Sequence, residues 1–99
     1  MKTPWGESQV IDKFAEGIEF VSTAGHGGMK LSADRNSKVP YSWRQNSFNG
    51  DGLRGWYEED CDVALVIMTF PEFFKAEIVE EAKKMMVKYH PDCDLSLVA

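Results

Sequence analysis

Two short segments of the 99-residue chain carry residue types that could do chemistry. The first, residues 22–28, reads STAGHGG and places His26 between glycines. An imidazole titrates near neutral pH, and hydroxyls with free backbone N–H groups can bind an anion. The same composition suits an ordinary hairpin turn, whose glycines serve backbone geometry. Because no phosphate-loop lysine follows and His90 stands at no metal-ligand spacing, the pattern favours the turn and predicts no metal site.

The second segment, residues 55–62, reads GWYEEDCD and holds four carboxylates, at Glu58, Glu59, Asp60 and Asp62. Carboxylate clusters bind divalent cations or act as general acids and bases. Acidic residues also open helices, where they stabilise the N-terminal dipole and cap free N–H groups. We favour the helix start, which makes Trp56 and Tyr57 aromatic anchors between a strand and a helix. No catalytic residue, cofactor or metal ion is expected.

The cysteines and the apolar runs indicate in which cellular compartment the protein is expected. Cys61 follows three acids, whose negative charge raises a thiol pKa, so it is a poor nucleophile. Cys61 and Cys93 have neither disulfide-framework density nor metal-ligand spacing, which fits a reducing compartment. The longest apolar run, residues 63–68, is far shorter than the roughly 20 residues of a membrane span. The N-terminus lacks the apolar stretch of a secretory signal. We therefore expect a cytoplasmic protein without a membrane partner.

The net charge of −5 is concentrated in one half of the chain. Residues 1–50 carry six Lys/Arg against five Asp/Glu, whereas residues 51–99 carry five against eleven. Binding to nucleic acid through a basic face requires clustered Lys and Arg, which this pattern disfavours. A basic surface on another protein is the better match for an acidic half.

Hydrophobic periodicity predicts the elements that must position these segments. Apolar residues at spacings of three and four predict a helix over residues 74–89, ended by Pro91. Residues 60–71 could form a buried strand or a buried helix, and we favour the helix. Residues 18–31 alternate around the glycine-rich run and predict a β-hairpin. Residues 55–58 could return as a third strand beside it.

Three further segments are predicted less directly. Residues 8–15 suggest a short helix, and Ser32 suggests the N-cap of a helical turn stopped by Pro40. Residues 47–55, with three glycines, are expected to form a loop. The sequence thus predicts one α+β domain over residues 1–99: a short antiparallel sheet packed against two C-terminal helices.

Three blocks of the sequence together resemble a known family. They are residues 3–6 (TPWG) with Gln9, residues 22–28, and residues 55–60 (GWYEED) with the Phe-Pro pair at 70–71. The chain is similar to an uncharacterised small-domain family, a domain of unknown function common in tailed phages, plasmids and integrated elements of proteobacteria and actinobacteria. The resemblance implies a mobile-element origin and marks the His26 loop and residues 56–60 as family hallmarks. It carries over no catalytic residue.

Three functions follow as hypotheses. The first is a non-enzymatic accessory protein that binds a host protein or nucleoprotein complex, for example an anti-CRISPR or other counter-defence inhibitor. Its recognition face would be acidic, with the binding residues His26, Trp56, Tyr57, Glu58, Glu59, Asp60 and Asp62. The second is a small enzyme or anion-binding protein in which His26 acts with Glu58, Glu59 or Asp60, at about 3 Å or bridged by one water. The third is a self-associating module that uses Met85 and Met86, and the oligomeric state stays open.

Overall fold

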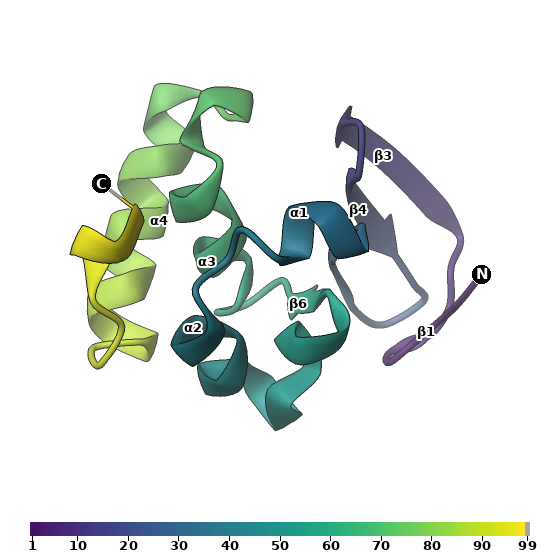
Figure 1. Ribbon diagram of the computed structural model, residues 1–99. Helices are drawn as coiled ribbons and strands as arrows, with labels where there is room; N and C mark the ends of the chain where they lie inside the picture. Colours follow the sequence, from purple (N-terminus) through teal and green to yellow (C-terminus); the bar gives the residue numbers. More distant parts are fainter. Residues whose placement is uncertain (99) are drawn as a thin grey trace.

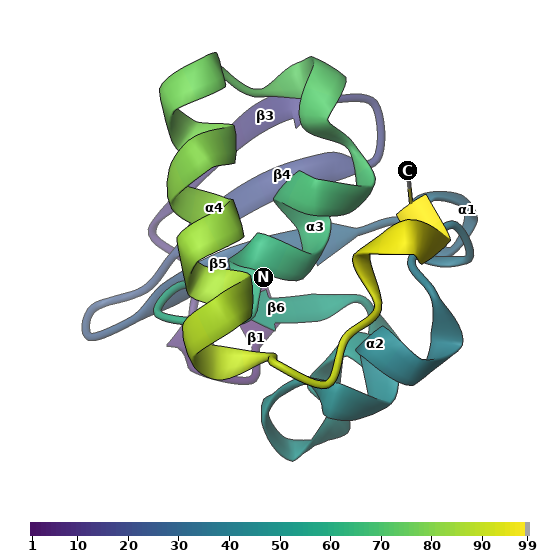
Figure 2. The ribbon, with the colours of Figure 1, turned by 90° about the vertical axis from the view of Figure 1, so that its left-hand side faces the viewer.

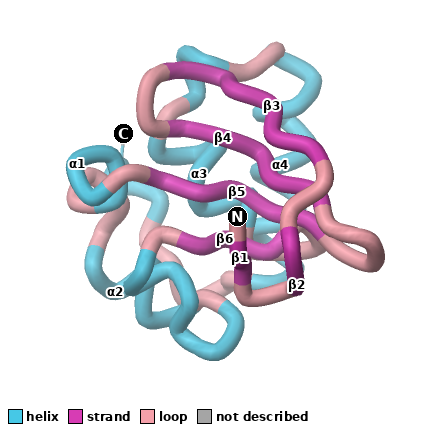
Figure 3. Tube along the Cα trace, turned by 90° about the vertical axis from the view of Figure 1, so that its right-hand side faces the viewer, coloured by secondary structure: helices cyan, strands magenta, loops and turns pink. Residues whose placement is uncertain are grey.

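A four-stranded antiparallel sheet organises the protein. The computed structural model describes residues 1–98, and its sheet runs in the order β3-β4-β5-β6. The strands are β3 (Val10–Ala15), β4 (Ile18–Ser22), β5 (Gly27–Leu31) and β6 (Trp56–Glu58). A separate small hairpin, β1 (Lys2–Thr3) with β2 (Gly6–Glu7), lies across β5 and β6 (Figure 3). The predicted hairpin and the predicted third strand are confirmed as β4, β5 and β6.

Helices cover the other face of the sheet. The two longest are α3 (Val63–Thr69) and α4 (Ala76–Tyr89), which lie on one side of the strands (Figures 1 and 2). The remaining helical elements are α1 (Ala33–Asn36), α2 (Tyr41–Asn46), and the 3₁₀ turns η1 (Phe48–Arg54), η2 (Pro71–Phe73) and η3 (Leu95–Val98). The predicted α+β class, with two C-terminal helices on a short antiparallel sheet, is confirmed.

The core lies between the sheet and α3. Side chains of one strand face, Ile18, Met29 and Tyr57, are buried against α3, because alternate residues of a strand point to the same side. The first five residues of α3 are all buried, which explains why their sequence shows no polar face. In α4 only Ala82 and Met86 are buried, so this helix presents a narrow apolar stripe to the core.

Residues 10–15 form a strand, so the prediction of a helix over residues 8–15 is wrong. Val10, Ile11 and Phe14 have helical spacing, but the segment pairs with β4 from Val10 opposite Ser22 to Ala15 opposite Ile18. The ladder of backbone hydrogen bonds offered by β4 outweighs a short local helical pattern. A register shift between Lys13 and Ala15 bends this edge strand.

The connection between β5 and β6 is more helical than the sequence suggests. Ser32 caps α1 as predicted, since its Oγ accepts the Arg35 N–H at 3.2 Å. Pro40, however, begins α2 instead of stopping a helix, which suits a residue with a fixed φ and no N–H. The expected loop over residues 47–55 contains η1, whose two halves are joined at Asn49 and Gly50 with positive φ.

The small N-terminal hairpin is held to the sheet by Trp5. The Trp5 ring lies directly over the backbone of Gly28, and it packs at right angles to the Trp56 ring with a centroid distance of 5.7 Å. Val21, opposite Gly28 in the sheet, is fully buried. Because Gly28 has no side chain, the Trp5 ring can pack directly against the sheet on the face opposite α3.

Candidate functional site

The two segments singled out in the sequence meet at one end of the sheet. Glu58 stands opposite Gly28 in the β5–β6 register, and the Glu59 N–H donates to the Gly27 carbonyl at 3.0 Å. His26, Glu59 and Asp60 are exposed there. We call these three residues the sheet-end surface. The sequence predicts both segments as candidates, and the sheet register brings them together.

The His26 loop is an ordinary turn by its hydrogen bonds. Thr23 Oγ1 donates to the His26 carbonyl at 2.8 Å and accepts the His26 N–H at 3.1 Å. Within residues 1–98 the His26 ring forms no ion pair or hydrogen bond with a carboxylate. His26 thus forms no direct acid–base pair within the described part of the chain, and the hydrogen bonds of the loop support its interpretation as a turn.

The two aromatic residues beside the acidic segment separate into surface and core. Trp56 is half-buried, with the Lys30 ammonium 5.4 Å from the centre of its ring. Tyr57 is fully buried, and its hydroxyl donates to Asn36 Oδ1. Burial raises the pKa of the Tyr57 phenol. Tyr57 is therefore a core anchor, as its role between strand and helix predicted, and it cannot belong to a recognition face.

The four carboxylates of this segment also differ in exposure: two lie at the surface, one is held in a turn and one is buried. Glu58 folds back, and its Oε1 accepts the N–H groups of Asp60 at 2.8 Å and Cys61 at 2.9 Å. Asp62 precedes α3 but makes no side-chain cap, and is only 1% exposed. Glu59 and Asp60 remain exposed. The predicted face of four carboxylates is therefore corrected to Glu59 and Asp60. Glu58 is engaged in hydrogen bonds within the turn, and Asp62 is buried.

Asp62 enters a buried polar centre that the sequence does not predict. We use this name for Cys61, Asp62 and His90 with the neighbouring Asn46. Asp62 Oδ2 accepts the Phe48 N–H at 2.7 Å, and Asp62 Oδ1 lies 3.3 Å from His90 Nε2. His90 Nδ1 lies 2.8 Å from Asn46 Oδ1. The imidazole thereby joins α2, the start of α3 and the end of α4.

The sequence does not predict His90 as a site residue, because the residues that it contacts are far away along the chain. It follows the last residue of α4 and precedes Pro91, a position that reads as a helix end. Its contact with the Cys61 carbonyl, at 3.1 Å, spans 29 positions. The sequence gives no local signal for this role, since the low exposure of His90, 4%, is a property of the folded chain. Burial becomes visible only in the fold.

Cys61 is a weak nucleophile in this setting. Burial, together with the Asp62 and Glu58 carboxylates, raises the pKa of its thiol to about 12. Burial and Asp92 also raise the pKa of the Cys93 thiol. The sequence-based expectation for Cys61 agrees with this direction.

We therefore predict slow alkylation of Cys61 in the native, chelator-treated protein. A pKa near 12 lowers the thiolate fraction at neutral pH about a thousandfold relative to an ordinary cysteine. The greater nucleophilicity of a more basic thiolate offsets part of this loss, which leaves a reaction about 30-fold slower. Pulsed iodoacetamide labelling with mass spectrometry measures the rate. Denatured protein is the control, and equal native and denatured rates would contradict the prediction.

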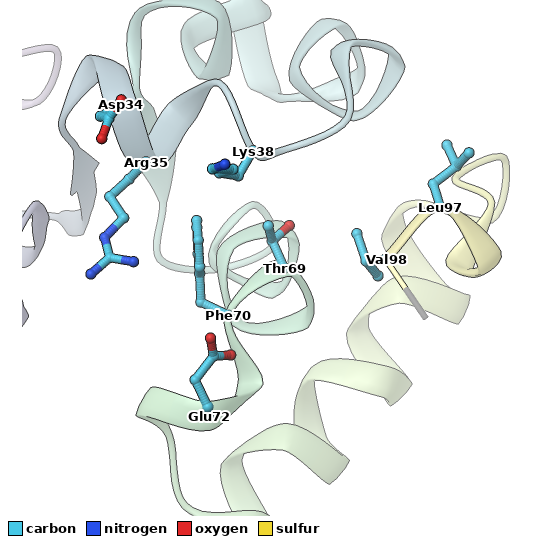
Figure 4. Close-up of a pocket in the computed structure, with 8 residues that line it drawn as sticks. All are labelled: Asp34, Arg35, Lys38, Thr69, Phe70, Glu72, Leu97 and Val98. Atoms are coloured by element: carbon cyan, nitrogen blue, oxygen red, sulfur yellow. The ribbon is translucent and has the colours of Figure 1, made fainter.

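The surface also carries a pocket that is lined by none of the predicted binding residues. It has a volume of about 390 Å³ and lies between α1 and the end of α3 (Figure 4). Arg35, Lys38, Asp34 and Glu72 line it, and the Arg35 guanidinium lies 5.5 Å from the centre of the Phe70 ring. Cationic and anionic groups alternate around this pocket, so it selects no single sign of ligand charge.

Comparison with known proteins places the chain by sequence alone. A family model described as a domain of unknown function (DUF7007) matches residues 1–95. No curated protein and no solved structure matches the chain. None of the helices in residues 1–98 has the length and apolar composition that crossing a membrane requires.

Proposed function

This chain belongs to the DUF7007 family, a domain of unknown function, and from its geometry we propose that it is a non-enzymatic binding protein. It acts as an accessory protein of a phage or other mobile element, in the cytoplasm of a bacterial host, by binding a host protein complex. One observation carries the proposal: the bond from Glu59 N–H to the Gly27 carbonyl unites the His26 loop and the acidic turn in one exposed surface.

The sheet-end surface suits recognition of a basic partner. No ion pair within residues 1–98 includes Glu59 or Asp60, so both carboxylates are free to meet external cations. The surface is formed by turns that rigid strands hold in place, which is how binding residues are commonly presented. The net charge of −5 adds long-range attraction toward a positive partner.

A counter-defence inhibitor is the specific form that we propose. Host nucleases and polymerases carry basic channels for nucleic acid, and exposed carboxylates can occupy such channels in place of phosphates. The acidic surface here is small, with Glu59 and Asp60 as its charged members. Neighbouring uncharged contacts must therefore contribute to the affinity, and Trp56, three positions before Glu59, is an aromatic candidate.

We predict that the double variant Glu59→Lys/Asp60→Lys loses partner binding by about tenfold or more. Two attractive carboxylates become two repulsive cations, and like-charge contacts across an interface are costly. The measurement begins with affinity purification from host lysate and identification of the partner by mass spectrometry. Titration calorimetry with the purified partner then compares the variant with the native protein. Binding of the native protein should also weaken as salt rises.

The matched control is Glu72→Lys/Glu77→Lys, which makes the same charge change at exposed positions away from the sheet-end surface. It should keep its affinity to within about twofold, because distant charges are screened over roughly 10 Å. Equal losses in both variants would mean that net charge decides binding, and the proposed surface would be wrong. If His26→Ala abolishes function while the charge reversal has no effect, the enzyme hypothesis takes its place.

A further inference from the structure

We propose that the buried polar centre is a zinc site, in which Cys61 Sγ, Asp62 Oδ1 and His90 Nε2 bind one Zn²⁺ ion. One ligand atom from each of these three residues lies within 4.8 Å of the others. Asp62 and His90 are buried, and Cys61 is half-buried. The inference is independent of the sheet-end surface and of partner binding.

Two of the three distances between the ligand atoms match tetrahedral coordination. Asp62 Oδ1 lies 3.3 Å from His90 Nε2 and 3.7 Å from Cys61 Sγ. With Zn–N and Zn–O bonds of about 2.0 Å and a Zn–S bond of about 2.3 Å, a tetrahedral ion separates nitrogen from oxygen by about 3.3 Å and sulfur from oxygen by about 3.5 Å. These two distances admit an ion with shifts of a few tenths of an ångström. The third distance, from Cys61 Sγ to His90 Nε2, is at most 4.8 Å, against about 3.5 Å around a tetrahedral zinc ion, so the Cys61 side chain would move inward by up to about 1.3 Å.

The outer atoms of two ligands are already held by neighbours. Asn46 Oδ1 accepts from His90 Nδ1 at 2.8 Å, which leaves the Nε2 lone pair directed at the site. Asp62 Oδ2 accepts the Phe48 N–H at 2.7 Å, which leaves Oδ1 facing the imidazole. Metal-binding histidines characteristically donate their second N–H to an oxygen in this way, and such contacts orient the ring and the carboxylate before the ion arrives.

A cation also resolves an electrostatic conflict in the centre. With the proton on Nδ1, His90 Nε2 faces two acceptors, the Cys61 carbonyl at 3.1 Å and Asp62 Oδ1 at 3.3 Å. A lone pair facing two oxygens inside a protein is unfavourable. A cation between Nε2 and Asp62 Oδ1 removes this repulsion, and it can be a second proton on the imidazole or a metal ion that binds both atoms.

The donor set selects zinc among the common divalent ions. A thiolate, a carboxylate and an imidazole are the ligands that zinc takes in proteins, whereas Mg²⁺ and Ca²⁺ prefer oxygen ligands. One thiolate and one carboxylate balance the charge of Zn²⁺, which suits a buried position. The fourth position is left to water on the side of the half-buried Cys61. The ion would connect the start of α3 with the end of α4.

Metal titration of the folded protein tests the site. The protein is purified, treated with a chelator, exchanged into chelator-free buffer, and titrated with Zn²⁺ by calorimetry and with Co²⁺ by absorbance. We expect one equivalent of either metal, a thiolate-to-cobalt charge-transfer band, and a melting temperature that rises with zinc concentration. Cys61→Ser should lose the charge-transfer band and weaken zinc binding about 100-fold. Cys93→Ser is the matched control and should behave as the native protein.

A second variant protects the test against misfolding. Asn46→Ala changes an exposed side chain and should weaken zinc binding about tenfold, because the imidazole loses its orienting acceptor. Circular dichroism checks that each variant is folded. A folded, metal-free native protein that takes up neither ion overturns the proposal and leaves a protonated His90 paired with Asp62. Full zinc affinity in folded Cys61→Ser overturns it as well.

Discussion

Asp62→Ala should lower the free energy of unfolding by about 3–5 kcal/mol, the largest loss that we expect from one side chain. The carboxylate is 1% exposed, accepts the Phe48 N–H and faces His90 Nε2 at 3.3 Å. Its removal leaves a buried imidazole without its carboxylate and a backbone N–H without its acceptor. Both are costly in an interior that water does not reach.

Chemical denaturation in the presence of a chelator measures this loss without any contribution from metal. A domain of this size is typically stable by about 5–15 kcal/mol, so the variant should unfold at a much lower denaturant concentration. Asp60→Ala is the control, since Asp60 is two positions away and exposed, and it should change stability by about 0.5 kcal/mol or less. Equal denaturation midpoints for the two variants would show that the buried contacts of Asp62 contribute nothing.

Gly28→Ala is the second change with a large expected effect. A Cβ atom at this position would overlap both the Tyr57 carbonyl oxygen and the ring of Trp5. The carbonyl belongs to the neighbouring strand β6, so it cannot move without breaking the β5–β6 ladder. We expect a loss of about 3 kcal/mol, at the upper end for overpacked sites. For a domain of this length that lowers the melting temperature by about 10–20 °C.

The control for this change is another glycine of the same hairpin. A Cβ atom at Gly25 would meet no atom within 4 Å, so Gly25→Ala should melt within about 2 °C of the native protein. Differential scanning calorimetry compares the two. If Gly28→Ala also melts like the native protein, then Trp5 is not held against the sheet as the structure has it.

Local pattern was enough to predict the central hairpin and the two C-terminal helices. The alternation of residues 18–31 around a glycine-rich turn predicts β4 and β5, because strand side chains alternate between two faces. The three-and-four spacing after Phe74 predicts α4, and Pro91 predicts where it ends. The same local reasoning fails for β3. A six-residue amphipathic pattern cannot tell whether a neighbouring strand will supply hydrogen bonds, and this is a property of the assembled sheet.

For the candidate site, too, the sequence predicts the residue types and the turns, whereas burial is known only from the fold. Residue types alone predict a turn at His26 and an acidic segment near Glu59, and both lie at the surface. They do not predict that Glu58 closes a turn, or that Tyr57 and Asp62 are buried. Exposure depends on what packs above a residue, and Asp62 contacts Phe48 in η1 and His90 at the end of α4, both distant in the sequence.

The sequence by itself determined the α+β class, the hairpin and the two C-terminal helices, because each depends on neighbours within a few positions. It also gave the direction in which the adjacent carboxylates shift the pKa of the Cys61 thiol, whereas the larger contribution, burial, comes from the fold. Only the tertiary structure decided that His90 meets Cys61 and Asp62, since 29 positions separate His90 from Cys61. Only the sheet register joined the His26 loop to Glu59. Contacts between distant segments arise when many weak interactions form together, and no short window of sequence contains them.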